Sequence, residues 1–432
     1  MSLFNIKNKV VLNASWIIGC RIIQSIFNLI ISMLTARFLG PANFGLINYA
    51  ESIVAFVAPI MQLGFTSIIV HELITEPDNE GEIIGTSILS CLVSGVLCIF
   101  AIFIFVYNVN SSEKLTLAVC VLYSLILVVQ AFEILSYWFE AHLLSRYSSV
   151  ISLLAYISVS IYKIFLLVTE KSICWFAISN TLDYLIIAIF QFILYKKLKG
   201  DTLSFSFERF KKMFNSGKYY ILSGMMIATF SQTDRVMLKL MIGNAVTGIY
   251  SAAFRCAGIT GFIFSAIINS ATPVIYASHN ENTDVFDKNI KRLYSIVLYI
   301  AFFQSVFMTI FARPIVNILY GYEFSPAIPV LQTITWYVAF SYMGTIRNRW
   351  MLAEGKEKLI WRIDLLGAVL NMFLNSIMIP LYGVMGAAIT SVFTQFFTNF
   401  VLGWFIKDVR RNNYLLVESL NPKILIDMFR NI

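Results

Sequence analysis

Charged residues and histidines are scarce in this sequence of 432 residues. Only 13% of the residues are charged and 58% are hydrophobic, whereas soluble domains carry roughly 25% charged residues. The 32 basic and 24 acidic residues are not gathered in a polar domain. This composition excludes an ordinary soluble domain and gives no surface for nucleic acid. We therefore expect a membrane protein without a nucleic-acid partner.

Motifs for catalysis, metal binding and nucleotide binding are also missing. None of the three histidines lies in an HxxxD arrangement, no GxxxxGK[ST] loop occurs, and the six cysteines lie in apolar runs without CxxC spacing. Outer loops are short and hold no acid/base cluster. These absences argue against an ATPase and against a membrane enzyme such as a glycan polymerase or acyltransferase. We expect a transporter without a cofactor, driven by an ion gradient or by consumption of its product.

Long apolar runs dominate what is present. A helix needs about 20 mainly apolar residues to cross a bilayer, and the sequence offers twelve such runs. They are predicted at residues 10–35, 46–70, 83–107, 115–139, 147–168, 172–195, 216–240, 246–272, 290–311, 328–347, 358–380 and 383–406. The sequence therefore predicts an all-α, polytopic membrane protein with twelve transmembrane helices.

The positions of Lys and Arg predict the orientation. Cytoplasmic loops carry the excess of basic residues, and here most of them follow every second predicted span or lie near the two ends. This pattern places both termini in the cytoplasm and the protein in the inner membrane. One loop, His71–Glu82, is an exception because it contains no Lys or Arg.

A Gly-containing connector occurs twice in the sequence. "RFLGPANFGLINYA" begins at Arg37 and "LMIGNAVTGIYSAA" begins at Leu240, so Gly40 matches Gly243 and Gly45 matches Gly248. Glycine permits tight turns and close helix packing. The repeat predicts two pseudo-symmetric six-helix lobes, 1–195 and 216–406, around a central cavity, with an amphipathic cytoplasmic linker at 196–215 and a cytoplasmic tail at 407–432. Chance similarity of two turns is the alternative.

Four segments carry a resemblance to a known family. Residues 39–65, 231–255, 318–327 and 352–391 together resemble the polysaccharide transporter family, the Wzx-type flippases of O-antigen and other repeat units. That family belongs to the MOP superfamily with the multidrug and toxin extruders and the lipid II flippase. The resemblance implies translocation of an undecaprenyl-pyrophosphate-linked oligosaccharide, with a polymerase and a chain-length regulator as partners. A small-molecule antiporter of the multidrug extruder type is the alternative.

Polar residues inside the spans are the candidate substrate site. A charge at the centre of the bilayer costs at least about 2.5–3.5 kcal/mol and normally faces a protein interior or a wet cavity. The candidates for the cavity are Arg21, Gln24, Asn28, Asn48, Gln62, Lys163, Asp183, Arg235 and Arg255. Arg21 and Arg255 are expected near mid-membrane, where a guanidinium pairs well with phosphate. An ion pair that only holds the bundle together is the alternative.

Two further groups of residues are predicted to form binding sites. Asp234, Asn371, Asn375, Thr390 and Thr394 lie on three spans of one half, and their oxygens suit a hard cation such as sodium, in a site that resembles that of lipid II flippase relatives. Pairing of Asp234 with Arg235 or Lys239, and proton coupling, are the alternatives. Arg347 and Arg349 are candidates for a cytoplasmic diphosphate entry site, with a positive-inside anchor as the alternative.

Overall fold

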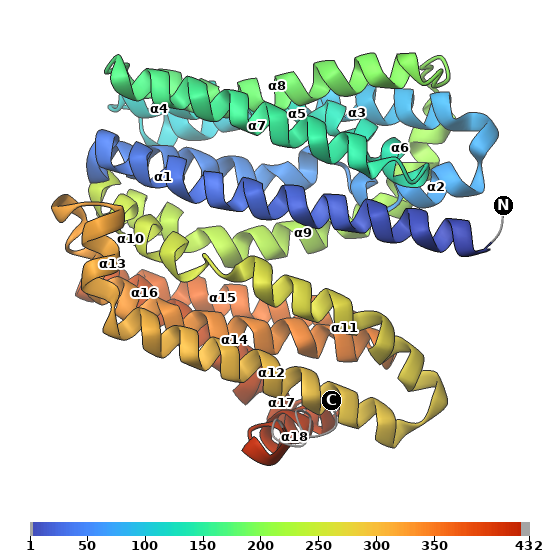
Figure 1. Ribbon diagram of the computed structural model, residues 1–432. Coiled ribbons are helices and arrows are strands. Elements are labelled where there is room, and N and C mark those ends of the chain that lie inside the picture. The colour runs from blue at the N-terminus through green and yellow to red at the C-terminus, as the bar shows by residue number, and fades with distance from the viewer. Residues whose placement is uncertain (1–2, 425–432) are drawn as a thin grey trace. The chain divides into compact units, whose positions relative to one another are not determined.

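The computed structural model describes residues 3–424, except the side chains of residues 3–15, 17, 18, 280 and 281. This part of the chain contains helices and no strand (Figure 1). The all-α prediction is therefore confirmed.

The helices follow one another with short connections. Those of the first half are α1 (Leu3–Met61), α2 (Ile69–Thr75), α3 (Glu80–Val109), α4 (Lys114–Ser124), α5 (Ile126–Gln130), α6 (Ile134–Ala141), α7 (Ser145–Val168) and α8 (Ile173–Lys197). Those of the second half are α9 (Phe207–Met241), α10 (Asn244–Ala257), α11 (Gly261–Glu281), α12 (Thr283–Ile310), α13 (Ala312–Leu319), α14 (Ala327–Ala353), α15 (Glu357–Tyr382), α16 (Val384–Phe396), α17 (Leu402–Phe405) and α18 (Arg410–Ser419).

Nine helices in the described part of the chain are long and apolar enough to cross a membrane. The count differs from the twelve predicted spans for two reasons. The first two predicted spans both lie within α1, which counts once, and the predicted spans at 216–240 and 328–347 lie in α9 and α14, which are 35 and 27 residues long but less apolar. At 1.5 Å per residue, both are long enough to cross a bilayer.

Two predicted spans are interrupted helices. The span expected at 115–139 consists of α4, α5 and α6 with the 3-10 turn η3 (Ala131–Glu133) between the last two. The span expected at 246–272 breaks after Ala257, and α11 restarts at Gly261. Hydropathy detects both as continuous runs because it measures composition and not backbone geometry.

The chain forms two compact units. One comprises residues 1–39 and 46–228, and the other comprises residues 40–45 and 229–432. In the first unit α7 packs along α8, and α3 packs on α4 and α5; in the second, α14 packs on α12, α16 and α10 (Figure 1). The boundary lies inside α9, so one continuous helix belongs to both units.

The repeated connector has a glycine with a positive φ angle and an extended ψ angle in both copies. Gly40, inside α1, has φ 67° and ψ 173°, and Gly243, before α10, has φ 133° and ψ −178°. Both positive φ angles favour glycine. The predicted helix-to-helix turn is therefore confirmed at both positions, and α1 is two helices joined at Gly40.

The predicted linker at 196–215 is only partly helical. Residues 201–206 lie outside helices, and α9 begins at Phe207. The non-helical segment runs against the start of α3: Ser204 N donates to Gly81 O at 3.2 Å, and Ser206 N donates to Thr86 Oγ1 at 3.0 Å. A Cβ on Gly81 or Gly85 would clash with the backbone of Thr202 or Ser204. Two glycines one helical turn apart thus make room for the segment.

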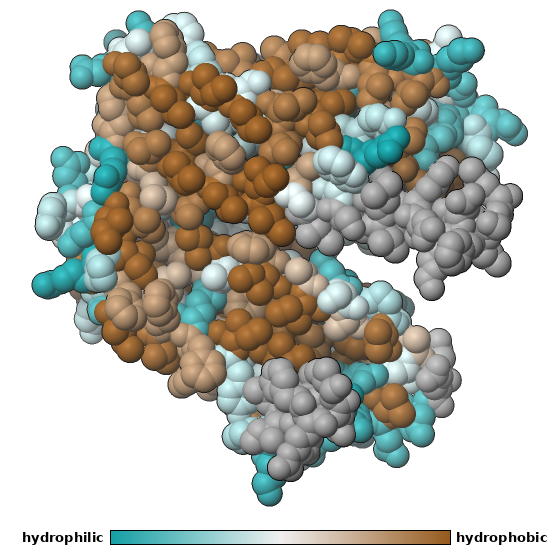
Figure 2. Space-filling view, viewed as in Figure 1, coloured by the Kyte–Doolittle hydropathy of each residue, from teal (hydrophilic) through white to brown (hydrophobic). Residues whose placement is uncertain are grey.

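Large apolar side chains cover the outer faces of the helices (Figure 2). On α3, Val93, Val96, Leu97 and Phe100 are between 56% and 65% exposed, at spacings of three or four residues that fall on one helical face. A face of this kind in water would be an aggregation hazard. The exposed faces support a multi-pass membrane protein.

Candidate functional site

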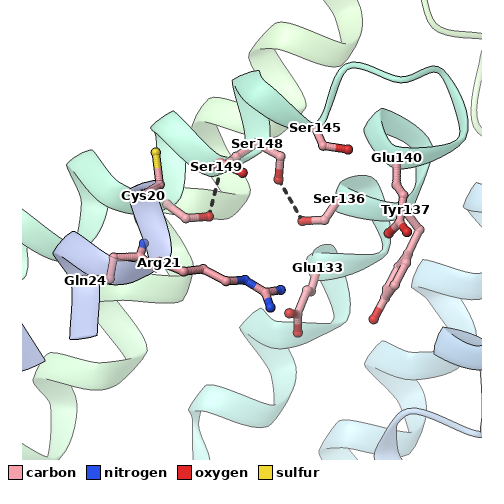
Figure 3. A pocket seen from close by; sticks show the side chains of 11 residues that line it. Cys20, Arg21, Gln24, Glu133, Ser136, Tyr137, Glu140, Ser145, Ser148 and Ser149 are labelled. Atoms are coloured by element: carbon pink, nitrogen blue, oxygen red, sulfur yellow. Dashed lines mark hydrogen bonds between the residues drawn. The ribbon is translucent and has the colours of Figure 1, made fainter. Parts of the chain in front are cut away.

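A polar pocket of about 350 Å³ lies within the first unit. Its wall includes Arg21 and Gln24 of α1, and Figure 3 shows the guanidinium of Arg21 directed toward Glu133. The full lining is Cys20, Arg21, Gln24, Glu133, Ser136, Tyr137, Glu140, Ser145, Ser148, Ser149 and Ser152. Two of the residues predicted for the cavity therefore share one pocket, although neither Glu133 nor the serines were among the predicted site residues.

Other predicted cavity residues of the first unit lie away from this pocket. Asn28 is exposed, Gln62 is half-buried and Asn48 is fully buried. Lys163 of α7 donates to Asn180 Oδ1 at 2.8 Å, and Asp183 is one turn further along α8. Lys163, Asn180 and Asp183 thus form a second polar group, separate from the lining of the Arg21 pocket.

Asp234 of α9 is the centre of a buried polar cluster in the second unit. Its side chain is 6% exposed. Oδ1 accepts a hydrogen bond from Asn375 Nδ2 at 2.6 Å, and Oδ2 accepts from Tyr250 Oη at 2.5 Å and from Ser391 Oγ. Four helices, α9, α10, α15 and α16, therefore converge on one carboxylate. Neutral donors make these three bonds, which stabilise a charge that burial would otherwise penalise.

The oxygens around this carboxylate suit a small cation. Asn371 Oδ1 accepts from Asn375 Nδ2 at 3.0 Å, which places it beside Asp234. Asn375 Oδ1, Thr390 Oγ1 and Thr394 Oγ1 are buried and have no hydrogen-bond partner in the described part of the chain. Buried oxygens without donors are costly. Binding a hard cation would satisfy them. Asn375 turns its Nδ2 to Asp234, so its Oδ1 would share a cation with this carboxylate only after its amide turns over, and the sodium site stays a prediction.

Arg235 and Arg255 also lie in the second unit. Arg235 is 7% exposed, and its guanidinium lies 4.9 Å from the ring centre of Phe254. Arg255 of α10 lies 5.8 Å from the ring centre of Phe44. The side chains make cation–π contacts. Because Arg21 belongs to the other unit, the expectation that Arg21 and Arg255 share a cavity stays a prediction.

The two arginines proposed for diphosphate entry differ in their surroundings. Arg347 is 2% exposed; its Nη1 donates to Thr398 O at 3.0 Å, and its Nη2 lies 3.8 Å from Asp364 Oδ1. Arg349 is half-buried, and its Nη2 donates to Asn269 Oδ1 at 3.3 Å. A guanidinium enclosed in this way has little surface to offer a headgroup. The contacts of Arg347 favour a role in holding the helices together over a role in binding the diphosphate.

Sequence reasoning missed Tyr250 and Ser391. Ser391 directly follows Thr390, and Tyr250 lies in the repeated connector, so both were near residues already singled out. Neither side chain is charged, so neither was selected as a costly group within a span. Only the packing of α10 and α16 against α9 brings their hydroxyls to Asp234.

Comparison with known proteins gives a consistent result. The sequence model of the family described as "Polysaccharide biosynthesis protein" matches residues 10–279. The chain is 21% identical to "Capsular polysaccharide biosynthesis protein CapF" of Staphylococcus aureus, over 89% of this chain and 96% of that protein. It is 22% identical to "Putative O-antigen transporter" of Shigella flexneri, over 82% of this chain and 87% of that protein.

The fold is similar to that of a solved transporter. An inward-facing multidrug resistance transporter of the MATE family, in the MOP superfamily, superposes with a TM-score of 0.69 at 16% identity, covering 91% of this chain and 96% of that one. At this level of identity, the similarity supports a shared fold and not a shared substrate or activity. The two-lobe helical architecture predicted from the repeated connector agrees with it.

Proposed function

Because the chain belongs to the family of polysaccharide biosynthesis proteins, we propose that it is a flippase for a lipid-linked oligosaccharide. Its substrate is an undecaprenyl-pyrophosphate-linked repeat unit of a surface polysaccharide, moved from the inner to the outer leaflet of the cytoplasmic membrane. Movement occurs by alternating access, the mechanism associated with paired helical repeats. The protein is a transporter and not an enzyme.

One observation supports this proposal beyond the comparisons. Several polar groups of the spans lie in protein-lined clusters, with Arg21 and Gln24 in the pocket of the first unit and Asp234 in the cluster of the second. Such groups mark substrate and ion pathways in membrane proteins. A purely structural bundle would have no need for a pocket of about 350 Å³ lined by polar side chains.

The Asp234 cluster is the proposed coupling site. Sodium would be held by the carboxylate of Asp234 and by oxygens of Asn371, Asn375, Thr390 and Thr394. A bound cation supplies the link between the ion gradient and the conformational change. A proton on Asp234 is the alternative coupling species.

The flippase proposal is tested by deletion of the gene followed by separate labelling of the lipid-linked glycan in each leaflet. We expect the glycan to accumulate in the inner leaflet and export to recover when the intact chain is restored. An unaltered distribution between leaflets would reject the proposal. If, in addition, purified protein exchanged cationic drugs for sodium across vesicles, the multidrug extruder alternative would replace it.

A further inference from the structure

Two helical stripes of polar residues line the pocket of the first unit. Around α6 the stripe is Glu133, Ser136, Tyr137 and Glu140, and on α7 it is Ser145, Ser148, Ser149 and Ser152. Both follow the spacing i, i+3, i+4, i+7, which places four side chains on one helical face. Figure 3 shows Arg21 directed toward Glu133 and a hydrogen bond that joins Ser148 of one stripe to Ser136 of the other.

The apolar residues between the polar positions of α6 form its buried face. Ile134, Leu135, Trp138 and Phe139 are at most 4% exposed, whereas the stripe residues are half-buried, apart from the exposed Glu140. The helix therefore has a closed apolar face and an open polar face. A polar face inside a membrane bundle is costly unless it meets water or a polar ligand.

A buried amide fixes the inner side of the pocket. Gln191 of α8 is fully buried, and its Nε2 donates to Ser136 Oγ and to Ser148 Oγ, each at 2.8 Å. Ser148 Oγ also donates to Ser136 Oγ at 3.3 Å. One side chain thus holds a serine of each stripe in place. Ser136 Oγ donates back to Gln191 Oε1 at 3.2 Å, so both hydroxyl hydrogens are donated within the cluster, and Ser148 Oγ keeps one acceptor position for a ligand.

The charges of the pocket discriminate between parts of the substrate. Two acidic side chains, Glu133 and Glu140, accompany one basic side chain, Arg21, so the lining holds more acidic than basic groups. A diphosphate or an acidic sugar would meet repulsion from both glutamates. A neutral polyhydroxyl ring would not, because carboxylates and serine hydroxyls accept and donate the hydrogen bonds that sugar hydroxyls make. The volume of about 350 Å³ falls in the range of small-ligand pockets.

We propose that this pocket binds a sugar ring without phosphate or carboxylate groups, presented by the lipid-linked oligosaccharide. The inference rests on the proposed flippase function. It changes the expected role of Arg21, which contacts sugar hydroxyls beside Glu133 and does not hold the pyrophosphate. Glu133, Tyr137 and Glu140 become binding residues, and Gln191 becomes a positioning residue.

Binding to the purified full-length protein in lipid nanodiscs tests the proposal, with saturation-transfer NMR as the readout. The probes are glucose, N-acetylglucosamine, glucuronate and inorganic pyrophosphate. We expect transfer to the two neutral sugars and little to the two anions. Ser149→Phe fills the pocket and should weaken sugar binding roughly tenfold or more. Ser158→Phe is the matched control, because Ser158 lies exposed on the same helix, outside the pocket, and should bind as the natural protein does.

A charge-neutralising variant separates recognition from pocket shape. Glu133→Gln removes one negative charge and should raise binding of glucuronate relative to glucose. The proposal is overturned if the natural protein prefers glucuronate or pyrophosphate, if it binds no neutral sugar at millimolar levels, or if Ser149→Phe binds sugar unchanged. The flippase function is judged separately by leaflet labelling. If the lipid-linked glycan is missing from the outer leaflet in the deletion strain but is present there with Ser149→Phe, the sugar-binding role of the pocket is rejected and the flippase function is retained.

Discussion

Arg209 Nη1 lies 2.6 Å from Glu76 Oε2, and Arg209 Nε lies 3.1 Å from Glu82 Oε1. Both carboxylates belong to the segment His71–Glu82, which was predicted as a loop without Lys or Arg and runs from α2 to the first turn of α3. Lys212 Nζ adds contacts to Glu72 and Glu76 at 3.1 and 2.5 Å. The linker thus brings the positive charge that this segment lacks, at the side predicted to face the cytoplasm.

Arg209 should matter more for stability than Lys212. Arg209 is 8% exposed and contacts three glutamates, whereas the side chain of Lys212 is 52% exposed. Arg209→Ala removes the partner that three carboxylates share, leaves Glu82 without its contact to Arg209, and should cost about 2 kcal/mol. Lys212→Ala should cost no more than about 1 kcal/mol. Thermal unfolding of the detergent-solubilised protein measures both, and equal losses would show that enclosure is not the deciding factor.

The same cluster should weaken in acid. Hydrogen bonds from Lys212, and then from Arg209, lower the pKa of Glu76 from 4.5 to about 2. Since the folded pKa lies below the unfolded one, the stabilisation is complete above pH 4.5 and is lost as the pH falls toward about 2. We expect the unfolding temperature of the natural protein to fall more steeply over this interval than that of Glu76→Gln. Parallel curves for the two proteins would contradict this assignment.

The matched glycines of the repeated connector should not tolerate a side chain. A Cβ on Gly45 would lie 2.6 Å from Gly248 N, and a Cβ on Gly248 would lie 3.0 Å from Gly45 N and closer still to the carbonyl of Pro41. Gly248→Ala should cost about 1–3 kcal/mol through overpacking.

Gly258→Ala is the control for this prediction. The nearest atom to its Cβ is Phe254 O at 3.5 Å, an ordinary contact. We expect a change within about 0.5 kcal/mol, as is usual away from tightly packed features. The difference between the two variants, measured by chemical or thermal unfolding, reports the close approach of the two connectors. It should vanish if these connectors separate in the membrane.

Sodium should stabilise the protein through Asp234. A ligand that binds only the folded state raises stability by RT ln(1 + [L]/Kd), about 2.7 kcal/mol at a concentration of 100 Kd. We expect sodium chloride, but not choline chloride, to raise the unfolding temperature, and Asp234→Asn to abolish the difference. Lys163→Met, in the other unit, should keep it. A sodium effect that survives in Asp234→Asn would place the ion elsewhere or favour another coupling species.

Individual elements differ in how far the sequence could predict them. The turns at Gly40 and Gly243 were predictable because a positive φ angle demands glycine, and the local sequence records that demand. The break after Ala257 has a local signal in Gly258 and Gly261, which hydropathy does not weigh. The break around η3 has no glycine or proline to mark it. Among the candidate sites, Asp234, Asn371 and Asn375 were grouped from their oxygen side chains on the spans of one half and from the resemblance, and hydrogen bonds join Asn375 to the other two.

Other groupings required the packed structure. Helical periodicity gives the face of one helix on which a residue lies, but not the neighbour that this face meets. Arg347 therefore looked accessible at a helix end, although packing encloses it between Thr398 and Asp364. Tyr250 and Ser391 were missed for the same reason, as was the pairing of Glu133 with the serines of α7 in one pocket.

Apolar length and backbone freedom are local properties, so the sequence is enough to predict a bundle of membrane-spanning helices with a repeated Gly connector. Which polar groups meet depends on how the helices pack: Asp234 with Tyr250 and Ser391, Arg209 with the acidic segment, and two polar stripes around one pocket. Burial makes each unpaired charge or hydroxyl costly, while the partner that removes the cost lies on another helix, at a distance along the chain that no local pattern encodes.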